Sequence, residues 1–273
     1  AHSWVMSFDS ELEAFRAFAK SSPKNCTLLI DTYDVREGCE HAITVAKEME
    51  AVGERLSAIR IDSGDLTYLS IKARKMLDEA GLTDCSIVAS NSLDEFTIES
   101  ILKEGAKIDS FGVGERLITA KSEPVFGGVY KLAAVEDQQG NIIPKIKISE
   151  NVEKITIPHF KKVYRFYGND TGKAIADYIT VYDETLDDTK DLEIFDPSAT
   201  WKKKTVYNFT ARPLLVPVFL GGKRVYDSPS LPEIQAYCRQ QVDTLWDEVK
   251  RFDNPHTYYV DLSRKLWTIK NDM

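Results

Sequence analysis

The strongest constraint on the fold is an alternation of two patterns over about the first 120 residues. Short apolar runs, typical of buried strands, alternate with segments whose apolar residues recur at helical spacing. The strand-like runs cover residues 27–31, 57–62, 85–89 and 108–111. Parallel strands buried on both faces are nearly continuous apolar runs, and helices connect them in βαβ units. The pattern therefore predicts either an open doubly wound sheet or the latter part of a barrel, because a closed eight-stranded barrel needs ~250 residues.

Local signals mark where the predicted helices begin and end. Two helical stripes end at Gly53 and Gly81, and glycine readily adopts the left-handed conformation that follows many helices. Ser92 and Glu95 have the spacing of a capping box, which predicts that the third helix begins there.

A different pattern follows from residue 123. Short strand-like segments alternate with turn signals such as Gly168-Asn169-Asp170, which predicts an antiparallel meander. These segments are 127–132, 142–148, 162–167 and 175–182. Ser230 and Glu233 form a second capping box, which opens a long helix whose apolar stripe is expected to pack in a core. We therefore divide the chain into βα units (1–122), a mostly β region packing in part on them (123–229), and a C-terminal helix and tail (230–273).

Composition excludes several classes of protein. The chain has 273 residues, 43% of them hydrophobic, and a formal net charge of −8, which argues against capture of DNA or RNA. The longest apolar run, 214–220, is interrupted by Pro217 and is far shorter than the ~20 residues of a membrane span. The first residues carry neither a basic segment nor an apolar signal core. We therefore expect a soluble, cytoplasmic protein without a membrane or nucleic-acid partner.

The cysteines and histidines do not form a metal-binding pattern. Neither a C-x-x-C pair nor a cluster of histidines occurs among the four cysteines and four histidines. The sequence predicts buried free thiols and no structural zinc site.

Polar and small residues follow each predicted parallel strand. These are Asp31 to Asp34, Arg60 to Asp65, Ser90 to Ser92 and Gly112 to Arg116. The carboxyl ends of parallel strands lie at one edge of the sheet, where ligands bind. Carboxylates bind ribose hydroxyls or Mg²⁺, and glycine N–H groups at a helix start bind phosphate. The combination predicts a sugar-phosphate site, although each aspartate alone equally fits a helix N-cap.

Seven segments, in this order, resemble nicotinate phosphoribosyltransferases. They are Ala1-His2-Ser3-Trp4, Ile30-Asp31-Thr32-Tyr33-Asp34, Arg60-Ile61-Asp62-Ser63-Gly64-Asp65, Ala89-Ser90-Asn91, Phe111-Gly112-Val113-Gly114, Gly127-Gly128-Val129-Tyr130-Lys131-Leu132 and Arg212-Pro213-Leu214-Leu215-Val216-Pro217-Val218. The resemblance covers essentially the whole chain. It implies an α/β fold, part of an irregular (β/α) barrel of the type II phosphoribosyltransferase kind, followed by a mostly antiparallel β region and a C-terminal helix. It also implies that the chain is the C-terminal part of a longer protein and begins inside the family's histidine motif.

The resemblance further implies an activity. The family joins nicotinate to phosphoribosyl pyrophosphate, which gives nicotinate mononucleotide and pyrophosphate in NAD salvage, and couples this reaction to ATP hydrolysis. His2 matches the histidine that ATP phosphorylates transiently, and Arg60 matches an arginine beside nicotinate and ribose. Asp62 matches a carboxylate for the ribose or for the magnesium pyrophosphate, without an assured direct bond from the protein to the metal.

The remaining matched positions are expected to bind substrate. Asp31 and Ser63 support the carboxylate motif, Ser90 and Asn91 form a turn at ribose or phosphate, and Gly112 and Gly114 resemble the 5′-phosphate cradle. Arg116 would add charge to that cradle, and a surface salt bridge is its simpler alternative.

The implied cofactor and partners are Mg²⁺, nicotinate, phosphoribosyl pyrophosphate, ATP as co-substrate, and a second copy of the chain in a dimer with a shared site. Three alternatives remain. One is nicotinamide phosphoribosyltransferase, against which the Ile-Asp-Ser-Gly-Asp-Leu and Ile-Asp-Thr-Tyr-Asp spellings argue. The second is an inactive sugar-phosphate-binding fragment, and the third an open α/β module of the receiver or flavodoxin kind.

Overall fold

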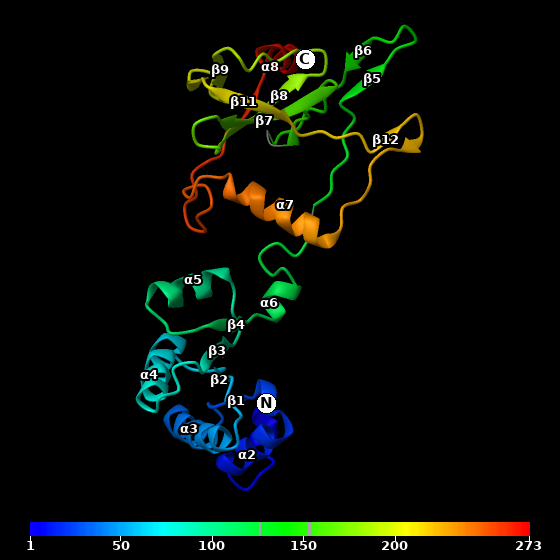
Figure 1. Cartoon of the computed structure of the whole chain (residues 1–273). Coiled ribbons are helices and arrows are strands. Elements are labelled where there is room, and N and C mark those ends of the chain that lie inside the picture. Colours follow the sequence, from blue (N-terminus) through cyan, green and yellow to red (C-terminus); the bar gives the residue numbers. More distant parts are fainter. Residues whose placement is uncertain (126, 152–153) are drawn as a thin grey trace. The chain divides into compact units, whose positions relative to one another are not determined.

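The computed structural model describes residues 1–125, 127–151 and 154–273. The chain divides into two compact units, residues 1–127 and 128–273 (Figure 1). We describe each unit by itself. The three-part division inferred from the sequence stays a prediction.

The first unit is built on a sheet of four parallel strands. These are β1 (Thr27–Leu29), β2 (Ala58–Ile61), β3 (Ser86–Ser90) and β4 (Ser110–Gly112), which lie in that order. Each strand pairs in parallel with the next, so all four carboxyl ends lie at one edge. The parallel α/β sheet expected from the sequence is confirmed, whereas closure into a barrel is not.

Helices connect these strands in βαβ order. They are α3 (Val35–Ala51), α4 (Leu66–Glu79) and α5 (Glu95–Lys103), preceded by α1 (His2–Val5), α2 (Glu11–Ser21) and the 3₁₀ turn η1 (Pro23–Asn25), and followed by α6 (Glu115–Ile118). The side chains of Asp34, Asp65 and Asp94 cap α3, α4 and α5 by accepting hydrogen bonds from backbone N–H groups. The capping box predicted at Ser92 is therefore wrong, because Ser92 has a positive φ of 43° and the cap lies two residues later.

The core of the first unit lies between the sheet and its helices. Ile30, Ile59 and Ile87 are completely buried and belong to one continuous apolar cluster. Helix α3 approaches the chain at the end of β1 so closely that a Cβ on Gly38 would lie 2.1 Å from the carbonyl oxygen of Ile30. A glycine is required there because any side chain would overlap the backbone.

The second unit contains a mixed four-stranded sheet in the order β11-β7-β8-β14. Its strands are β7 (Lys161–Gly168), β8 (Ala174–Val181), β11 (Phe209–Pro213) and β14 (Val260–Leu262), and only β14 is parallel to its neighbour. Three two-stranded sheets pair β5 (Ala134–Glu136) with β6 (Ile142–Pro144), β9 (Leu192–Phe195) with β10 (Lys203–Val206), and β12 (Phe219–Leu220) with β13 (Lys223–Arg224). The antiparallel pairing is as expected, but residues 127–132 form no strand and the strand predicted over 142–148 ends at Pro144.

Helices α7 (Leu231–Asp243) and α8 (Arg264–Asn271) also belong to the second unit. The capping box at Ser230 and Glu233 is present as predicted. The expected core packing of α7 is wrong, because none of its residues is buried. Polar contacts join it to the sheet instead, such as the 3.0 Å hydrogen bond from Tyr167 Oη to Gln241 Oε1.

The cysteines are all free thiols, as expected, but only three are buried. Cys26, Cys39 and Cys85 lie in the core of the first unit, while Cys238 on α7 is exposed. Within the part of the chain that the structure describes, no helix has the length and apolarity to cross a membrane.

Candidate functional site

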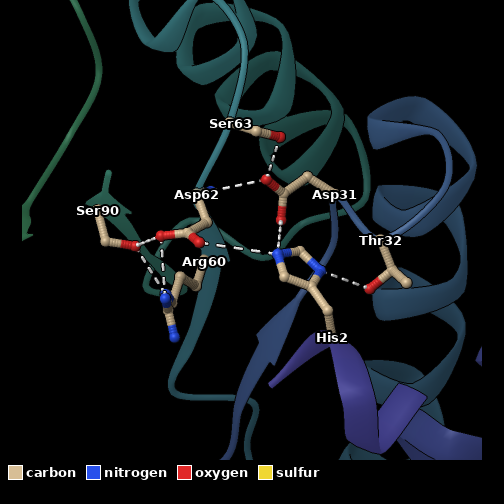
Figure 2. Close-up of polar contacts among 7 residues, drawn as sticks. All are labelled: His2, Asp31, Thr32, Arg60, Asp62, Ser63 and Ser90. Atoms are coloured by element: carbon tan, nitrogen blue, oxygen red, sulfur yellow. Dashed lines mark hydrogen bonds and ion pairs between the residues drawn. The ribbon is translucent and has the colours of Figure 1, made fainter. Parts of the chain in front are cut away.

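The imidazole of His2 lies among oxygen atoms from the ends of β1 and β2 (Figure 2). Its Nε2 atom is 3.7 Å from Asp62 Oδ2 and 4.0 Å from Asp31 Oδ1. Its Nδ1 atom is 3.1 Å from the hydroxyl of Thr32. His2 is 39% exposed, so solvent and a ligand can reach the ring from one side.

Asp31 forms the buried base of this cluster. Its side chain is 1% exposed, and Oδ2 accepts hydrogen bonds from the backbone N–H of Asp62 at 2.8 Å and from the hydroxyl of Ser63 at 2.6 Å. Its other oxygen, Oδ1, is buried without a hydrogen-bond partner and lies on the side of His2 (Figure 2). A buried acceptor without a partner costs free energy, so this oxygen is available for a donor that His2 or a ligand brings.

Asp62, Arg60 and Ser90 form a second layer of contacts. Arg60 Nε donates to Ser90 Oγ at 2.8 Å, Arg60 Nη2 donates to Asp62 Oδ1 at 3.0 Å, and the Ser90 hydroxyl also donates to Asp62 Oδ1. Partial burial would raise the pKa of Asp62. The hydrogen bonds from Ser90 and Arg60, with the positive charge of Arg60 and a smaller electrostatic contribution from His2, outweigh burial and hold that pKa below its usual value. Asp62 is therefore a carboxylate at neutral pH.

The local sequence explains why these side chains meet. Strands β1 and β2 end just before Asp31 and Asp62, and their parallel register brings the two ends together. Gly64 has a φ of +77°, which lets the chain turn directly into α4. His2 comes from outside the sheet, on α1, and the indole of Trp4 ties this helix to α2 by donating to the carbonyl of Ala14 at 3.3 Å.

The predicted phosphate cradle lies at the ends of β3 and β4. Asn91 has a φ of 109°, so the chain leaves β3 in a conformation that non-glycine residues rarely adopt. A Cβ on Gly112 would approach Ser90 Cβ to 3.3 Å, which keeps these two strand ends close. A Cβ on Gly114 would meet no atom within 4 Å, so no other part of the protein crowds the backbone at this position.

Arg116 does not lie free beside the glycines. Its guanidinium Nη1 donates to a carboxylate oxygen of Asp94, whose other oxygen caps α5 by accepting from the N–H of Thr97 at 2.8 Å. Arg116 therefore forms the salt bridge that was predicted from the sequence as the simpler of its two roles. Its predicted role as an additional charge in the cradle requires that the pair open.

Sequence reasoning missed two participants. Thr32 belongs to the quoted motif, but only the fold shows its hydroxyl at Nδ1 of His2. Asp94 was identified only from the structure, as the partner of Arg116. Its position before an apolar helical stripe is nevertheless a sequence signal for an N-cap. Lys131, from the Gly-Gly motif, donates to the carbonyl of Lys154.

Direct metal binding by protein groups has no support from the described residues. They contain no group of three or more His, Cys, Asp or Glu side chains placed to hold a metal ion. In Asp62, Oδ1 accepts hydrogen bonds from Arg60 and Ser90, and a contact of Asp62 with a metal ion stays a prediction.

The sequence of this chain is similar to those of known nicotinate phosphoribosyltransferases. Residues 160–270 match the family model of the nicotinate phosphoribosyltransferase C-terminal domain. The nicotinate phosphoribosyltransferase of Bacillus subtilis (strain 168) is 46% identical over 273 residues, which cover 99% of this chain and 55% of that protein. The predicted resemblance to nicotinate phosphoribosyltransferases is confirmed.

Solved structures agree with the sequence match. Human nicotinic acid phosphoribosyltransferase superposes with a TM-score of 0.72 at 28% identity, over 96% of this chain and 49% of that chain. A nicotinate-nucleotide pyrophosphorylase from Pyrococcus furiosus has a TM-score of 0.59 at 24% identity, over 89% of this chain and 54% of that chain, and shares the fold. The chain spans about half the length of the curated nicotinate phosphoribosyltransferases that it matches.

Proposed function

We propose that this chain carries the histidine and phosphoribosyl side of a nicotinate phosphoribosyltransferase, which forms nicotinate mononucleotide and pyrophosphate with coupled hydrolysis of ATP. The observation that supports this most is the position of His2. Its ring lies against two carboxylates at the carboxyl edge of a parallel sheet, beside Arg60 and Ser90. The sequence and structural relatives are named for the same activity.

In this proposal Nδ1 of His2 is the nucleophile toward the γ-phosphate of ATP. The carboxylates of Asp31 and Asp62 both face Nε2, and negative charge favours the tautomer whose proton is on that nitrogen. Nδ1 then carries the lone pair and accepts from Thr32. Attack by Nδ1 forms an N–P bond while the bond from the γ-phosphorus to the bridging oxygen breaks, and ADP leaves. Water later cleaves the N–P bond, which returns His2 and releases phosphate.

Arg60 and Asp62 would organise the ribose and the leaving group. Ser90 and Asp62 already bind Arg60 through Nε and Nη2, so a two-pronged contact with the nicotinate carboxylate has to displace one of them. Asp62, ionised at neutral pH, suits the positive charge that develops at C1 of the ribose during transfer. Asn91, Gly112 and Gly114 would bind the 5′-phosphate through backbone N–H groups.

Magnesium ion, when bound, would neutralise the charge of the pyrophosphate leaving group. We propose that it binds through the pyrophosphate, since the described carboxylates do not form a cage of their own. A dimer with a shared site and a cytoplasmic location complete the proposal. Two alternatives to this proposal are a nicotinamide phosphoribosyltransferase and an inactive fragment that binds sugar phosphates, and the experiment must exclude both.

The test measures nicotinate mononucleotide formed from nicotinate or nicotinamide, with phosphoribosyl pyrophosphate and Mg²⁺, in the presence and absence of ATP. The purified chain is compared with a protein extended to the length of its relatives. We expect product from nicotinate, stimulated by ATP, and loss of that stimulation in His2→Gln while His256→Gln, which changes an exposed histidine, retains it. Stimulation that survives His2→Gln contradicts the role of His2. No product from the extended protein contradicts the activity.

A further inference from the structure

The second unit contains a cavity of about 500 Å³ that the proposed function does not use. Its floor is the turn between β7 and β8 with the beginning of β8, and its two walls come from residues 204–208 and from the segment 246–259. All of its lining residues lie within residues 128–273, so none belongs to the unit that carries His2. Sites for small molecules typically have volumes of ~300–1,000 Å³, and this cavity lies within that range.

Backbone hydrogen bonds hold one wall to β8. The N–H of Ala174 donates to the carbonyl of Thr244 at 2.8 Å, and the N–H of Asp177 donates to the carbonyl of Tyr259 at 2.9 Å. The segment that forms this wall is therefore tied to the strand on both sides of the cavity.

The opposite wall is held to the turn between β7 and β8. The N–H of Asn169 donates to the carbonyl of Asn208 at 3.0 Å, and the side-chain Nδ2 of Asn169 donates to Oδ1 of Asn208 at 3.2 Å. Because both walls are anchored to the same pair of strands, the cavity is preformed, which reduces the ordering cost of binding.

Aromatic side chains that border the cavity remain largely open to solvent. Tyr207, Trp246 and Tyr259 are 70%, 40% and 41% exposed. The rings of His256 and Tyr259 lie nearly perpendicular, with centroids 6.2 Å apart and an angle of 77° between their planes. Exposed apolar surface gathered around a cavity is typical of a ligand site, and the faces of such rings stack on flat ligands.

The ammonium group of Lys204 also lines the cavity, 5.7 Å from the centroid of the Tyr259 ring. The residue before it, Lys203, pairs with Glu193 on β9 at 2.9 Å. Lys204 itself forms no ion pair with any residue that the structure describes. Its positive charge is therefore available to an anionic group of a ligand.

Two carboxylates, Asp170 and Glu248, belong to the same lining. Their charge exceeds that of the single ammonium, which disfavours ligands with several negative groups, such as inorganic polyphosphate or a nucleoside triphosphate. A ligand that suits this lining has a flat ring for the aromatic side chains and one anionic group for Lys204.

We propose that the cavity is a binding site for a mononucleotide, a flat heteroaromatic ring joined through ribose to one phosphate. Trp246 and Tyr259 provide faces for the ring, and Lys204 pairs with the phosphate. Two sources supply this chemistry, a pyridine mononucleotide and an adenine mononucleotide. The first is the product of the proposed function and rests on it, whereas the second does not.

The test follows the indole N–H signals of the four tryptophans by NMR on the 273-residue chain. The ligands are nicotinate mononucleotide and adenosine monophosphate, and ribose 5-phosphate is the control that lacks a ring. Trp246→Phe and Trp4→Phe assign two signals, of which Trp4 lies on the helix that carries His2 and reports binding there. We expect a saturable shift of the Trp246 signal with a mononucleotide and none with ribose 5-phosphate. The ligand that saturates this shift at the lower concentration identifies the source.

A pair of neighbouring lysines tests the phosphate contact. Lys204→Gln should weaken the binding reported by Trp246 about tenfold, because it removes a charge-assisted hydrogen bond. Lys203→Gln removes the same charge from the same strand at a position outside the lining, and should leave the affinity unchanged.

Three results would overturn the proposal. One is a Trp246 signal that neither mononucleotide moves at millimolar concentration. The others are an equal response to ribose 5-phosphate and equal weakening by the two lysine variants, since a general attraction to positive charge produces both. Movement of the Trp4 signal alone would support a ligand site around His2 and contradict this one. Movement of Trp246 by adenosine monophosphate, when the extended protein forms no nicotinate mononucleotide, would sustain this site and contradict the proposed activity, so the two failures are distinguishable.

Discussion

The two units of this chain use apolar and charged residues in different ways. The first unit has one continuous core between a parallel sheet and its helices, and a cluster of ionisable residues lies at the carboxyl edge of that sheet around His2. The described residues of the second unit form two smaller buried clusters, one around Phe166 and one around Leu266. Its sheet also contains an ion pair, in which Arg165 contacts Asp177 at 2.7 and 2.8 Å. Many of its large apolar residues are exposed, among them Phe219, Leu220, Leu231 and Ile234.

This difference shows why a binding site forms more readily at the edge of a parallel sheet than at the edge of an antiparallel sheet. In a parallel sheet all strand ends of one polarity meet at one edge, so polar residues distant in sequence converge without belonging to the core. In an antiparallel sheet successive strand ends alternate, and the charged residues pair across strands, as Arg165 on β7 does with Asp177 on β8. Four predictions test this comparison, from the largest expected effect to the smallest.

Phe166→Ala should have the largest effect on stability. Phe166 is completely buried and packs on Tyr178 and Phe209 at ring-centroid distances of 5.4 and 4.7 Å. Its truncation should reduce the free energy of unfolding by about 3–5 kcal/mol. Urea unfolding measures the loss, and Phe160→Ala, at a half-exposed ring, is the control and should cost far less. Hydrogen exchange then shows whether the loss is confined to residues 128–273. An equal loss of protection in the first unit would mean that the two cores unfold as one.

Asp261→Asn should remove a pH dependence of stability in the second unit whose sign is opposite to that of Asp62 in the first unit. Burial first, and the charge of Asp196 second, raise the pKa of Asp261 to about 6. The folded chain therefore holds a proton that the unfolded chain releases, and this group lowers stability as the pH rises from about 4 to 6. Asp62 acts the other way, since its lowered pKa gives stability that is present at neutral pH and lost on acidification.

We therefore expect Asp261→Asn to stabilise the chain at pH 7, by at most about 3 kcal/mol, and to have little effect near pH 4. Urea unfolding at both pH values measures this difference, with Asp253→Asn at an exposed position as the control. Equal effects at pH 4 and pH 7 would contradict the raised pKa.

Gly38→Ala should damage the first unit and its site together. The added Cβ would lie 2.1 Å from the carbonyl oxygen of Ile30, so α3 or the end of β1 must move. Such overpacking costs about 1–3 kcal/mol, and the movement would displace Asp31 from His2. Urea unfolding and the NMR shifts of His2 measure the two effects. Gly128→Ala is the control, since its Cβ meets no atom within 4 Å. Unchanged His2 shifts would show that Asp31 is not positioned through this contact.

Alkylation should distinguish the buried thiols of the first unit from the exposed thiol of the second unit. This experiment uses the native chain, so we expect no effect on stability. Burial raises the pKa of Cys26 and Cys85 to about 11 and, with smaller contributions from nearby charges, that of Cys39 to about 12, whereas Cys238 on α7 is exposed. Because the thiolate is the reactive form, iodoacetamide should label Cys238 first in the native chain. Peptide mass spectrometry identifies the labelled residue, and the Cys238→Ser chain is the control. Rapid labelling of Cys39 would mean that the first core opens readily.

Much of the first unit could be predicted from local sequence. The apolar runs that end at Asp31 and Asp62 specified the strands, and strands joined by helices specified parallel pairing. Ser230 and Glu233 likewise specified the start of α7. These features succeed because the cause of each structure lies within a few neighbouring residues.

The errors arose where tertiary contacts override local preference. The apolar stripe of α7 predicts burial, but periodicity states only which residues share a face and not whether anything covers that face. The partner of Arg116 also depends on the fold: the salt bridge given as its simpler alternative forms with Asp94, while its role at the cradle stays a prediction.

The sequence alone determined the kind of groups at the site and their order along the chain, since motifs and strand signals are local. The tertiary structure alone decided which groups touch: that Nε2 of His2 faces Asp31 and Asp62 while Nδ1 faces Thr32, and that Glu11 is buried against His41. Such contacts join residues about 30 to 60 positions apart. Their geometry depends on how the helices pack on the sheet, which no short segment encodes.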